Sequence, residues 1–133
     1  MIYVLDACAL IAFLRGETGA EVVENALLGT HSQCMAHAIN LCEVYYDFHR
    51  AGGESAADAA IVDIRALGLS ERDDIDELFW KEVGKLKAGG KVSLADCFAI
   101  TLTNRVGGTL MTSDHHELDA IASAGICTVT FIR

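Results

Sequence analysis

Residues 2–14 read IYVLDACALIAFL, and this stretch decides how the chain begins to fold. The uninterrupted apolar run 2–5, followed at once by Asp6, is typical of a strand that is buried on both faces, as in parallel sheets. Asp6 would then stand at the carboxyl end of that strand. In open α/β sheets ligands collect at this edge, because the loops that leave the strands splay apart there. Asp6 is therefore a candidate functional carboxylate. The same pattern is also expected of an acid that only caps the following helix.

Strand-like and helix-like segments alternate along the rest of the chain. The spacing of Thr18 and Glu21 is that of a capping box, which predicts that the second helix begins there. The expected strands are residues 2–5, 32–36, 69–70, 109–112 and 127–132. The expected helices are residues 7–14, 18–28, 38–50, 55–67, 73–88, 93–105 and 115–124. This alternation predicts one three-layer α/β domain, residues 1–133, with a mostly parallel sheet.

Composition narrows the class of protein. The longest apolar stretch near the start ends at Arg15, and the first residues contain neither a basic region nor a small-residue cleavage site, so neither a membrane span nor a secretory signal is expected. The five cysteines are odd in number, scattered and without a C-x-x-C pair, which argues against a disulfide framework and against a thiolate zinc site. These features predict a cytoplasmic protein with its cysteines reduced.

The charge is unevenly distributed. A net charge of −9 should repel nucleic acid over most of the surface, and only residues 81–105 are locally basic. Within that segment Lys87 and Lys91 precede Asp96, so they are candidate contacts for a phosphate backbone. The alternative is an ordinary solvated helix, because Glu77 and Lys81 have the spacing of a favourable ion pair.

Three further acids share the unusual placement of Asp6. Glu43 lies on a largely apolar helix, Asp96 lies in the first turn after Ser93, and Asp114 follows an apparent strand. Each also has a plain structural explanation: exposure for Glu43, a capping box for Asp96 and a helix cap for Asp114. If the strands are parallel, however, all of these carboxylates can meet at one edge of the sheet.

Clustered carboxylates repel one another, and a bound divalent cation removes that conflict. Carboxylate oxygens suit hard ions such as Mg²⁺ or Mn²⁺. Such a site can activate water and stabilise the leaving oxygen in phosphodiester cleavage. A metal-dependent nuclease or phosphatase is therefore the chemical class that the acids predict.

Four segments, taken together, resemble the PIN-domain family, in particular its small VapC-type toxins of toxin-antitoxin systems. They read VLD (residues 4–6), NLCEV (40–44), SLAD (93–96) and LMTSD (110–114). The resemblance implies a five-stranded parallel sheet with helices on both sides and a Mg²⁺- or Mn²⁺-dependent endoribonuclease. It also implies a homodimer that hydrolyses RNA and is held inactive by a cognate antitoxin protein.

The same resemblance assigns roles to residues. By position, Asp6, Glu43 and Asp96 look like the core acidic triad that binds the metal and carries catalysis, and Asp114 like the fourth acid of that site. Thr112 resembles the hydroxyl of the family's T-x-D motif, which helps to order the acidic edge.

Two other functions remain open from the sequence. One is a catalytically inactive PIN fold that serves as an RNA-binding or antitoxin-binding module. The other is a small phosphoryl-transfer domain in which Asp6 is the nucleophile rather than a metal ligand.

Overall fold

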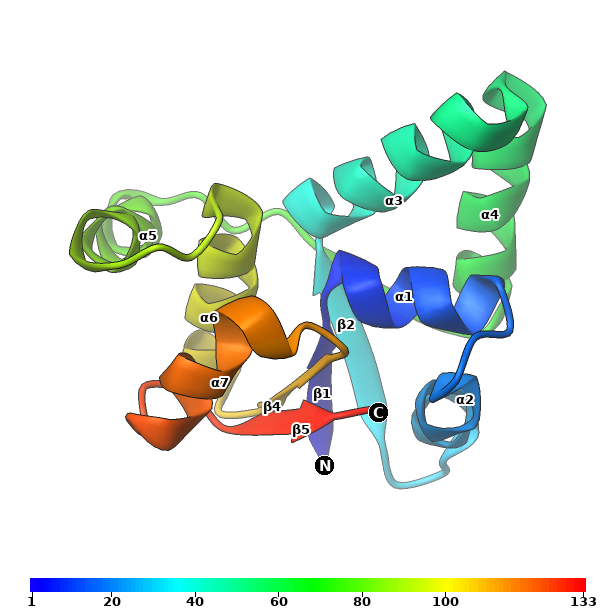
Figure 1. Cartoon of the computed structure of the whole chain (residues 1–133). Coiled ribbons are helices and arrows are strands. Elements are labelled where there is room, and N and C mark those ends of the chain that lie inside the picture. Colours follow the sequence, from blue (N-terminus) through cyan, green and yellow to red (C-terminus); the bar gives the residue numbers. More distant parts are fainter.

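The computed structural model describes all of residues 1–133 as a parallel sheet between layers of helices (Figure 1). The sheet has five strands in the order β3-β2-β1-β4-β5, and every neighbouring pair is parallel. The strands are β1 (Ile2–Leu5), β2 (Gln33–His37), β3 (Ser70–Arg72), β4 (Thr109–Thr112) and β5 (Val129–Phe131). The predicted α/β architecture is confirmed, with the first strand at the centre of the sheet.

Seven helices connect the strands. They are α1 (Ala7–Leu14), α2 (Ala20–Leu28), α3 (Ala38–Gly52), α4 (Glu54–Ala66), α5 (Glu77–Gly89), α6 (Leu94–Val106) and α7 (His115–Ser123). Figure 1 shows α5, α6 and α7 on one side of the sheet and α1 and α2 on the other, with α3 and α4 as a pair that extends beyond α1. None of these helices combines the length and the apolar character needed to span a membrane.

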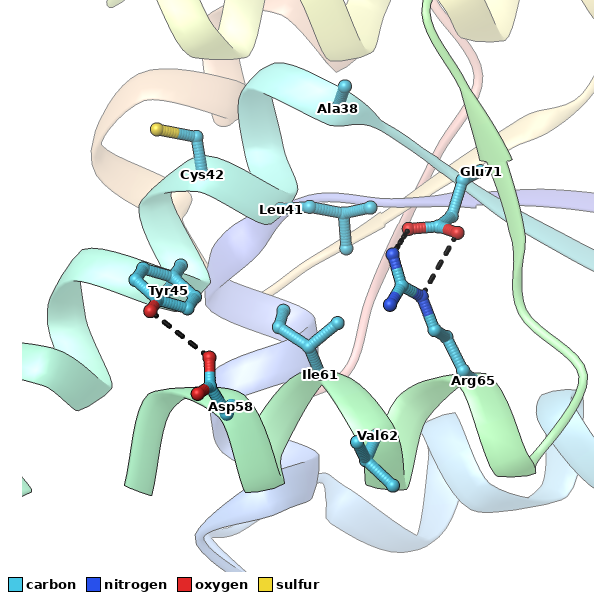
Figure 2. Close-up of a pocket in the computed structure, with 9 residues that line it drawn as sticks. All are labelled: Ala38, Leu41, Cys42, Tyr45, Asp58, Ile61, Val62, Arg65 and Glu71. Atoms are coloured by element: carbon cyan, nitrogen blue, oxygen red, sulfur yellow. Dashed lines mark hydrogen bonds and ion pairs between the residues drawn. The ribbon is translucent and has the colours of Figure 1, made fainter. Parts of the chain in front are cut away.

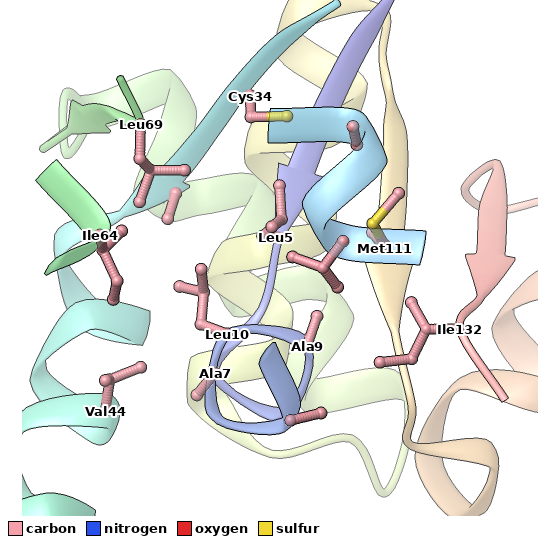
Figure 3. Close-up of a cluster of buried hydrophobic side chains, with 14 of the residues drawn as sticks. Leu5, Ala7, Ala9, Leu10, Cys34, Val44, Ile64, Leu69, Met111 and Ile132 are labelled. Atoms are coloured by element: carbon pink, nitrogen blue, oxygen red, sulfur yellow. The ribbon is translucent and has the colours of Figure 1, made fainter. Parts of the chain in front are cut away.

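Two hydrophobic clusters hold the layers together. One of 15 buried residues lies beneath α1 and α2 and includes Leu5, Leu10, Ile64 and Met111 (Figure 3). The other, of 14 buried residues, lies beneath α5, α6 and α7 and includes Leu110. Because the central strands contribute to both clusters, the carboxyl ends of β1 and β4 are fixed relative to the helices that follow them.

The start of α2 differs from the prediction. Its N-cap is Gly19, in the left-handed region at φ 97°, and Thr18 makes no capping bond, so the predicted capping box is wrong. A Cβ at position 19 would lie only 2.6 Å from the carbonyl oxygen of Ile132. The close approach of Ile132, just after the last strand, explains why a glycine occupies this position, and local sequence does not reveal it.

The third strand is also shifted. It covers Ser70–Arg72 rather than 69–70, because Leu69 is part of a buried cluster while Glu71 pairs in register with Ala36 of β2. Charged side chains are common on edge strands. Because β3 contains no apolar residue, its sequence does not resemble a buried strand.

Shortening a core side chain should lower the free energy of unfolding, and the size of the loss shows how much that side chain contributes to stability. Leu110 is fully buried on β4, so Leu110→Ala should lower the free energy of unfolding by about 2–5 kcal/mol. Leu28 on α2 is 59% exposed, so Leu28→Ala should change it by less than about 0.5 kcal/mol. Urea denaturation of both variants tests this, and equal losses would contradict the described core.

Candidate active site

An acidic pocket of about 230 Å³ opens at the carboxyl edge of the sheet. Helices α1, α3, α6 and α7 all present residues to it, and three of these helices begin directly after Asp6, Ser93 or Asp114. The residues that line it are Ala7, Cys8, Ile11, Glu43, Tyr46, Asp47, Ser93, Asp96, Asp114 and Glu117. Five of these ten carry a carboxylate, so negative charge dominates the pocket.

Asp6 lies beneath this pocket and is only 1% exposed. One carboxylate oxygen accepts a hydrogen bond from the backbone N–H of Ala9 at 2.9 Å, which caps α1, and the other accepts from the hydroxyl of Thr112. Burial raises the pKa of Asp6 to about 7 although both hydrogen bonds oppose this, and the nearby charges of Asp114 and Glu43 raise it further. Asp6 is thus a buried carboxyl group close to the other acids, and each of its oxygens accepts one hydrogen bond.

Thr112 ties Asp6 to the next acid along this edge. Its hydroxyl donates to Asp6 and accepts from the backbone N–H of Asp114 at 3.0 Å. The side chain is completely buried, so these two bonds have no competition from water. Thr112 therefore fixes the turn between β4 and α7.

Asp114 combines a structural bond with a free oxygen. Its Oδ1 accepts from the backbone N–H of Glu117 at 3.1 Å and caps α7, as the plain structural explanation expects. Its Oδ2 has no hydrogen-bond partner in the protein and remains available to a ligand.

Asp96 and Glu117 face each other across the start of α6. Ser93 caps that helix by accepting from the backbone N–H of Asp96 at 3.2 Å, and its own N–H donates to Glu117 Oε2 at 3.2 Å. Burial, followed by the interaction with Glu117, raises the pKa of Asp96, whereas the hydrogen bond with Asp96 lowers the pKa of Glu117. The opposite shifts mean that the two carboxyl groups resist being charged at the same time, because like charges repel.

Three of the carboxylates form a group that fits a metal ion. Asp96, Asp114 and Glu117 each offer one oxygen, and these oxygens lie within 4.8 Å of one another. An oxygen-only set of three acids matches the preference of hard divalent ions such as Mg²⁺ and Mn²⁺. A cation bound here would also offset the repulsion between the charged forms of Asp96 and Glu117.

Glu43 lines the same pocket from α3 but lies outside this group of three. Its Oε2 accepts from the hydroxyl of Tyr46 at 3.3 Å, and partial burial raises its pKa. Glu43 is therefore placed to contact water or substrate beside the three acids.

The structure thus brings the predicted acids to one edge of the sheet, although they do not all belong to the group of three. Asp96 and Asp114 are joined by Glu117, which the sequence analysis missed, while Asp6 lies below them and Glu43 beside them. The signal for Glu117 was present: Asp114 and Glu117 have the D-x-x-E spacing of a capping box, which places both acids in the same first turn.

The two candidate phosphate contacts differ in their surroundings. Lys87 donates through Nζ to the carbonyl oxygen of Val92 at 3.0 Å and so closes the loop between α5 and α6. Lys91 lines a separate groove, which also touches Glu117. Lys91 is consequently the more available of the two cations.

Cys8 is the one thiol in the acidic pocket. Burial and the surrounding carboxylates raise its pKa to about 12. The thiol is protonated at neutral pH, so it is not an activated nucleophile.

A larger cavity, of about 480 Å³, lies between α3, α4 and β3 (Figure 2). Its polar groups are already paired. Arg65 binds Glu71 through two hydrogen bonds, of 3.2 and 3.0 Å, and the Tyr45 hydroxyl donates to Asp58 at 3.1 Å. No group of convergent unpaired side chains is left there, and the acidic pocket is the better candidate for chemistry.

Comparison with known proteins agrees with this geometry. The PIN domain family profile matches residues 3–123. No curated protein sequence matches the chain significantly.

Solved structures with a similar fold include VapBC2 from Rickettsia felis bound to a promoter DNA fragment, at 15% identity and a TM-score of 0.74, with 98% of each chain covered. DNA-bound VapBC from Salmonella typhimurium has 14% identity and a TM-score of 0.74, with 100% of this chain and 99% of that chain covered. The sarcin-ricin loop cleaving toxin VapC20 from Mycobacterium tuberculosis has 16% identity and a TM-score of 0.69, with 90% and 95% covered. At these identities the likeness concerns the fold.

The buried carboxyl group of Asp6 predicts a dependence of stability on pH. In the unfolded chain its pKa is close to the ordinary value of 3.8, and in the folded protein it is about 7. Below the lower value the group is protonated in both states. As the pH rises through this interval the unfolded chain loses its proton first, so the free energy of unfolding falls.

Urea denaturation in EDTA at intervals from pH 5 to pH 8 should therefore show the free energy of unfolding falling more steeply in the wild type than in Asp6→Asn. The comparison cancels groups that titrate in both proteins, such as His115. Parallel curves for the two proteins would show that Asp6 ionises normally.

Proposed function

The chain belongs to the PIN domain family, and from this and the acidic pocket we propose that it is an endoribonuclease that depends on Mg²⁺ or Mn²⁺. The observation that carries the proposal is the group formed by Asp96, Asp114 and Glu117, whose oxygens converge within 4.8 Å at the carboxyl edge of the sheet. This is the edge at which α/β folds bind their ligands.

We assign Asp96, Asp114 and Glu117 to holding the ion. When bound, a divalent ion supplies an activated water and offsets the negative charge that develops on the phosphate. Asp114 contributes the oxygen that no protein donor uses, and the Ser93 N–H holds the carboxylate of Glu117 in place.

Asp6 is a positioning residue in this proposal rather than the nucleophile of a phosphoryl-transfer reaction. Both of its oxygens already accept a hydrogen bond, and only 1% of the residue is exposed, so an incoming phosphate has little access to it. Its hydrogen bonds with the Ala9 N–H and the Thr112 hydroxyl instead hold the start of α1 and the end of β4 in place. Glu43 is left free to orient water or substrate from α3.

RNA is the substrate class that the comparisons support. The Mycobacterium tuberculosis toxin VapC20 cleaves the sarcin-ricin loop, and it shares this fold over most of both chains. Two further structures are VapBC complexes, which supports an antitoxin protein as the partner that controls this chain.

Cleavage of RNA tests the proposal against the alternative of an inactive PIN module. Wild-type protein with Mg²⁺ or Mn²⁺ should cleave RNA, and Asp96→Asn should reduce the rate by about 100-fold or more, because it removes a proposed ligand. Asp63→Asn, at an exposed position on α4, makes the same chemical change away from the pocket and should leave the rate unchanged. Activity that survives Asp96→Asn would indicate a contaminant, and no activity in the wild type would favour the inactive module.

Metal binding can be measured separately from cleavage. A ligand that binds only the folded state raises its stability, so Mn²⁺ should raise the melting temperature of the wild type. Glu117→Gln should weaken this effect because it removes one of the three converging carboxylates, whereas Glu24→Gln, on the exposed side of α2, should not. An equal response in both variants would remove Glu117 from the proposed site.

A further inference from the structure

Basic side chains in this protein are mostly neutralised by acids. The chain has ten lysines and arginines, and most of them form an ion pair with a carboxylate. Those in ion pairs are Arg15, Arg65, Arg72, Lys81, Lys85, Arg105 and Arg133. Arg50, Lys87 and Lys91 are the three that remain, and they matter because a polyanion needs cations that are free to pair with it.

Two of these three have other partners. The guanidinium of Arg50 lies over the ring of Tyr46, 4.8 Å from its centre, and Lys87 donates to the carbonyl oxygen of Val92. Lys91 has no hydrogen bond, ion pair or aromatic contact, and its residue is exposed. In a chain with a net charge of −9, it is the one basic side chain without any partner.

Lys91 stands on a groove of about 450 Å³ that we call the Lys91 groove. Its wall is largely apolar or backbone, from the glycine pair that ends α5 and from α7 with the turn that follows it. The residues of this wall that matter here are Gly89, Gly90, Val92, Ala120, Ile121 and Ile126. A volume in this range, about 300–1,000 Å³, with an apolar wall and few polar groups is typical of a small-molecule site.

The Lys91 groove and the acidic pocket are neighbours. Glu117 lines both, and Val92 of the groove is followed directly by Ser93 of the pocket. The two sites are therefore placed to contact consecutive units of one polymer.

We propose that the Lys91 groove binds the nucleotide next to the scissile phosphate of the RNA, with Lys91 pairing with its phosphate and the nucleoside lying against Ala120, Ile121 and Ile126. This rests on the proposed function, since it takes the acidic pocket as the place of cleavage. The apolar wall offers contact to any base, whereas Lys91 offers the only uncommitted positive charge beside a pocket of carboxylates.

The proposed contact between Lys91 and a phosphate can be tested by measuring RNA binding under conditions without cleavage. A short fluorescein-labelled single-stranded RNA is titrated with protein in Ca²⁺, with its integrity checked on a gel. Lys91→Gln should raise Kd about three- to tenfold and reduce the slope of log K against log salt by about 0.7, the value for one phosphate contact on a single strand. Lys81→Gln removes the same charge from α5 but from an ion pair with Glu77, and it should change neither. Equal effects of the two variants would overturn the proposal.

Filling the groove tests the nucleoside contact. Ala120 is exposed on α7, so Ala120→Phe should fold normally, block the groove and raise Kd by a similar factor. Ala59→Phe makes the same change at an exposed position on α4 and should leave Kd unchanged. Melting temperatures of both variants confirm that they are folded, and unaltered RNA binding by Ala120→Phe would overturn the assignment of the nucleoside.

The outcomes separate this proposal from the function on which it rests. Wild-type protein that cleaves RNA with a KM unaffected by Lys91→Gln and Ala120→Phe would refute the groove and leave the nuclease. Protein that binds RNA through Lys91 but cleaves nothing would refute the nuclease while the groove stands as an RNA contact. Absence of any RNA binding would overturn both.

Discussion

The hydrogen bond from Thr112 to Asp6 joins the ends of the two central strands, and the arrangement of the acidic edge depends on it. Asp6 uses its other oxygen to begin α1, and Thr112 uses its own oxygen to hold the backbone of Asp114. One buried pair of side chains thus sets where α1 starts and where the turn before α7 lies. This contact therefore helps to determine where the neighbouring carboxylates lie.

The edge combines helix capping with a concentration of negative charge. Asp6 and Asp114 cap α1 and α7, and Ser93 caps α6 beside Asp96, so the residues that start the helices also surround the pocket. Burying acids close to one another is costly: burial is the main cause of the raised pKa values of Asp6 and Asp96, and neighbouring carboxylates add to it. Structural and functional explanations of these acids are therefore compatible: a cap uses one oxygen of Asp114 and leaves the second for a ligand.

Much of the fold could be predicted from the sequence because its signals are local. Apolar runs such as 2–5 and 109–112 and the glycines that end helices are visible in short windows. The errors came from contacts across the chain. Gly19 replaces the expected cap at Thr18 because Ile132 passes close by, and β3 is recognisable only through its pairing with β2.

In the candidate site, too, local signals could be predicted and contacts across the chain could not. Parallel strands predict that Asp6 and Asp114, which follow β1 and β4, lie at one edge of the sheet, and Asp96 in the first turn of α6 lies near Asp114. Glu117 escaped notice because an acid in the first turn of a helix already has an explanation in the helix dipole. Its second contact, to the N–H of Ser93, spans 24 residues and exists only in three dimensions.

The strand order also has a consequence for the time at which the pocket arises during synthesis. Residues 1–72 supply β1, β2 and β3, but Asp96, Asp114 and Glu117 all come later in the chain, where β4 adds to the open side of β1. A nascent chain emerging from the ribosome can assemble one flank of the sheet and still lack the convergent acids. The three converging acids can therefore meet only after residues 96–117 have been synthesised.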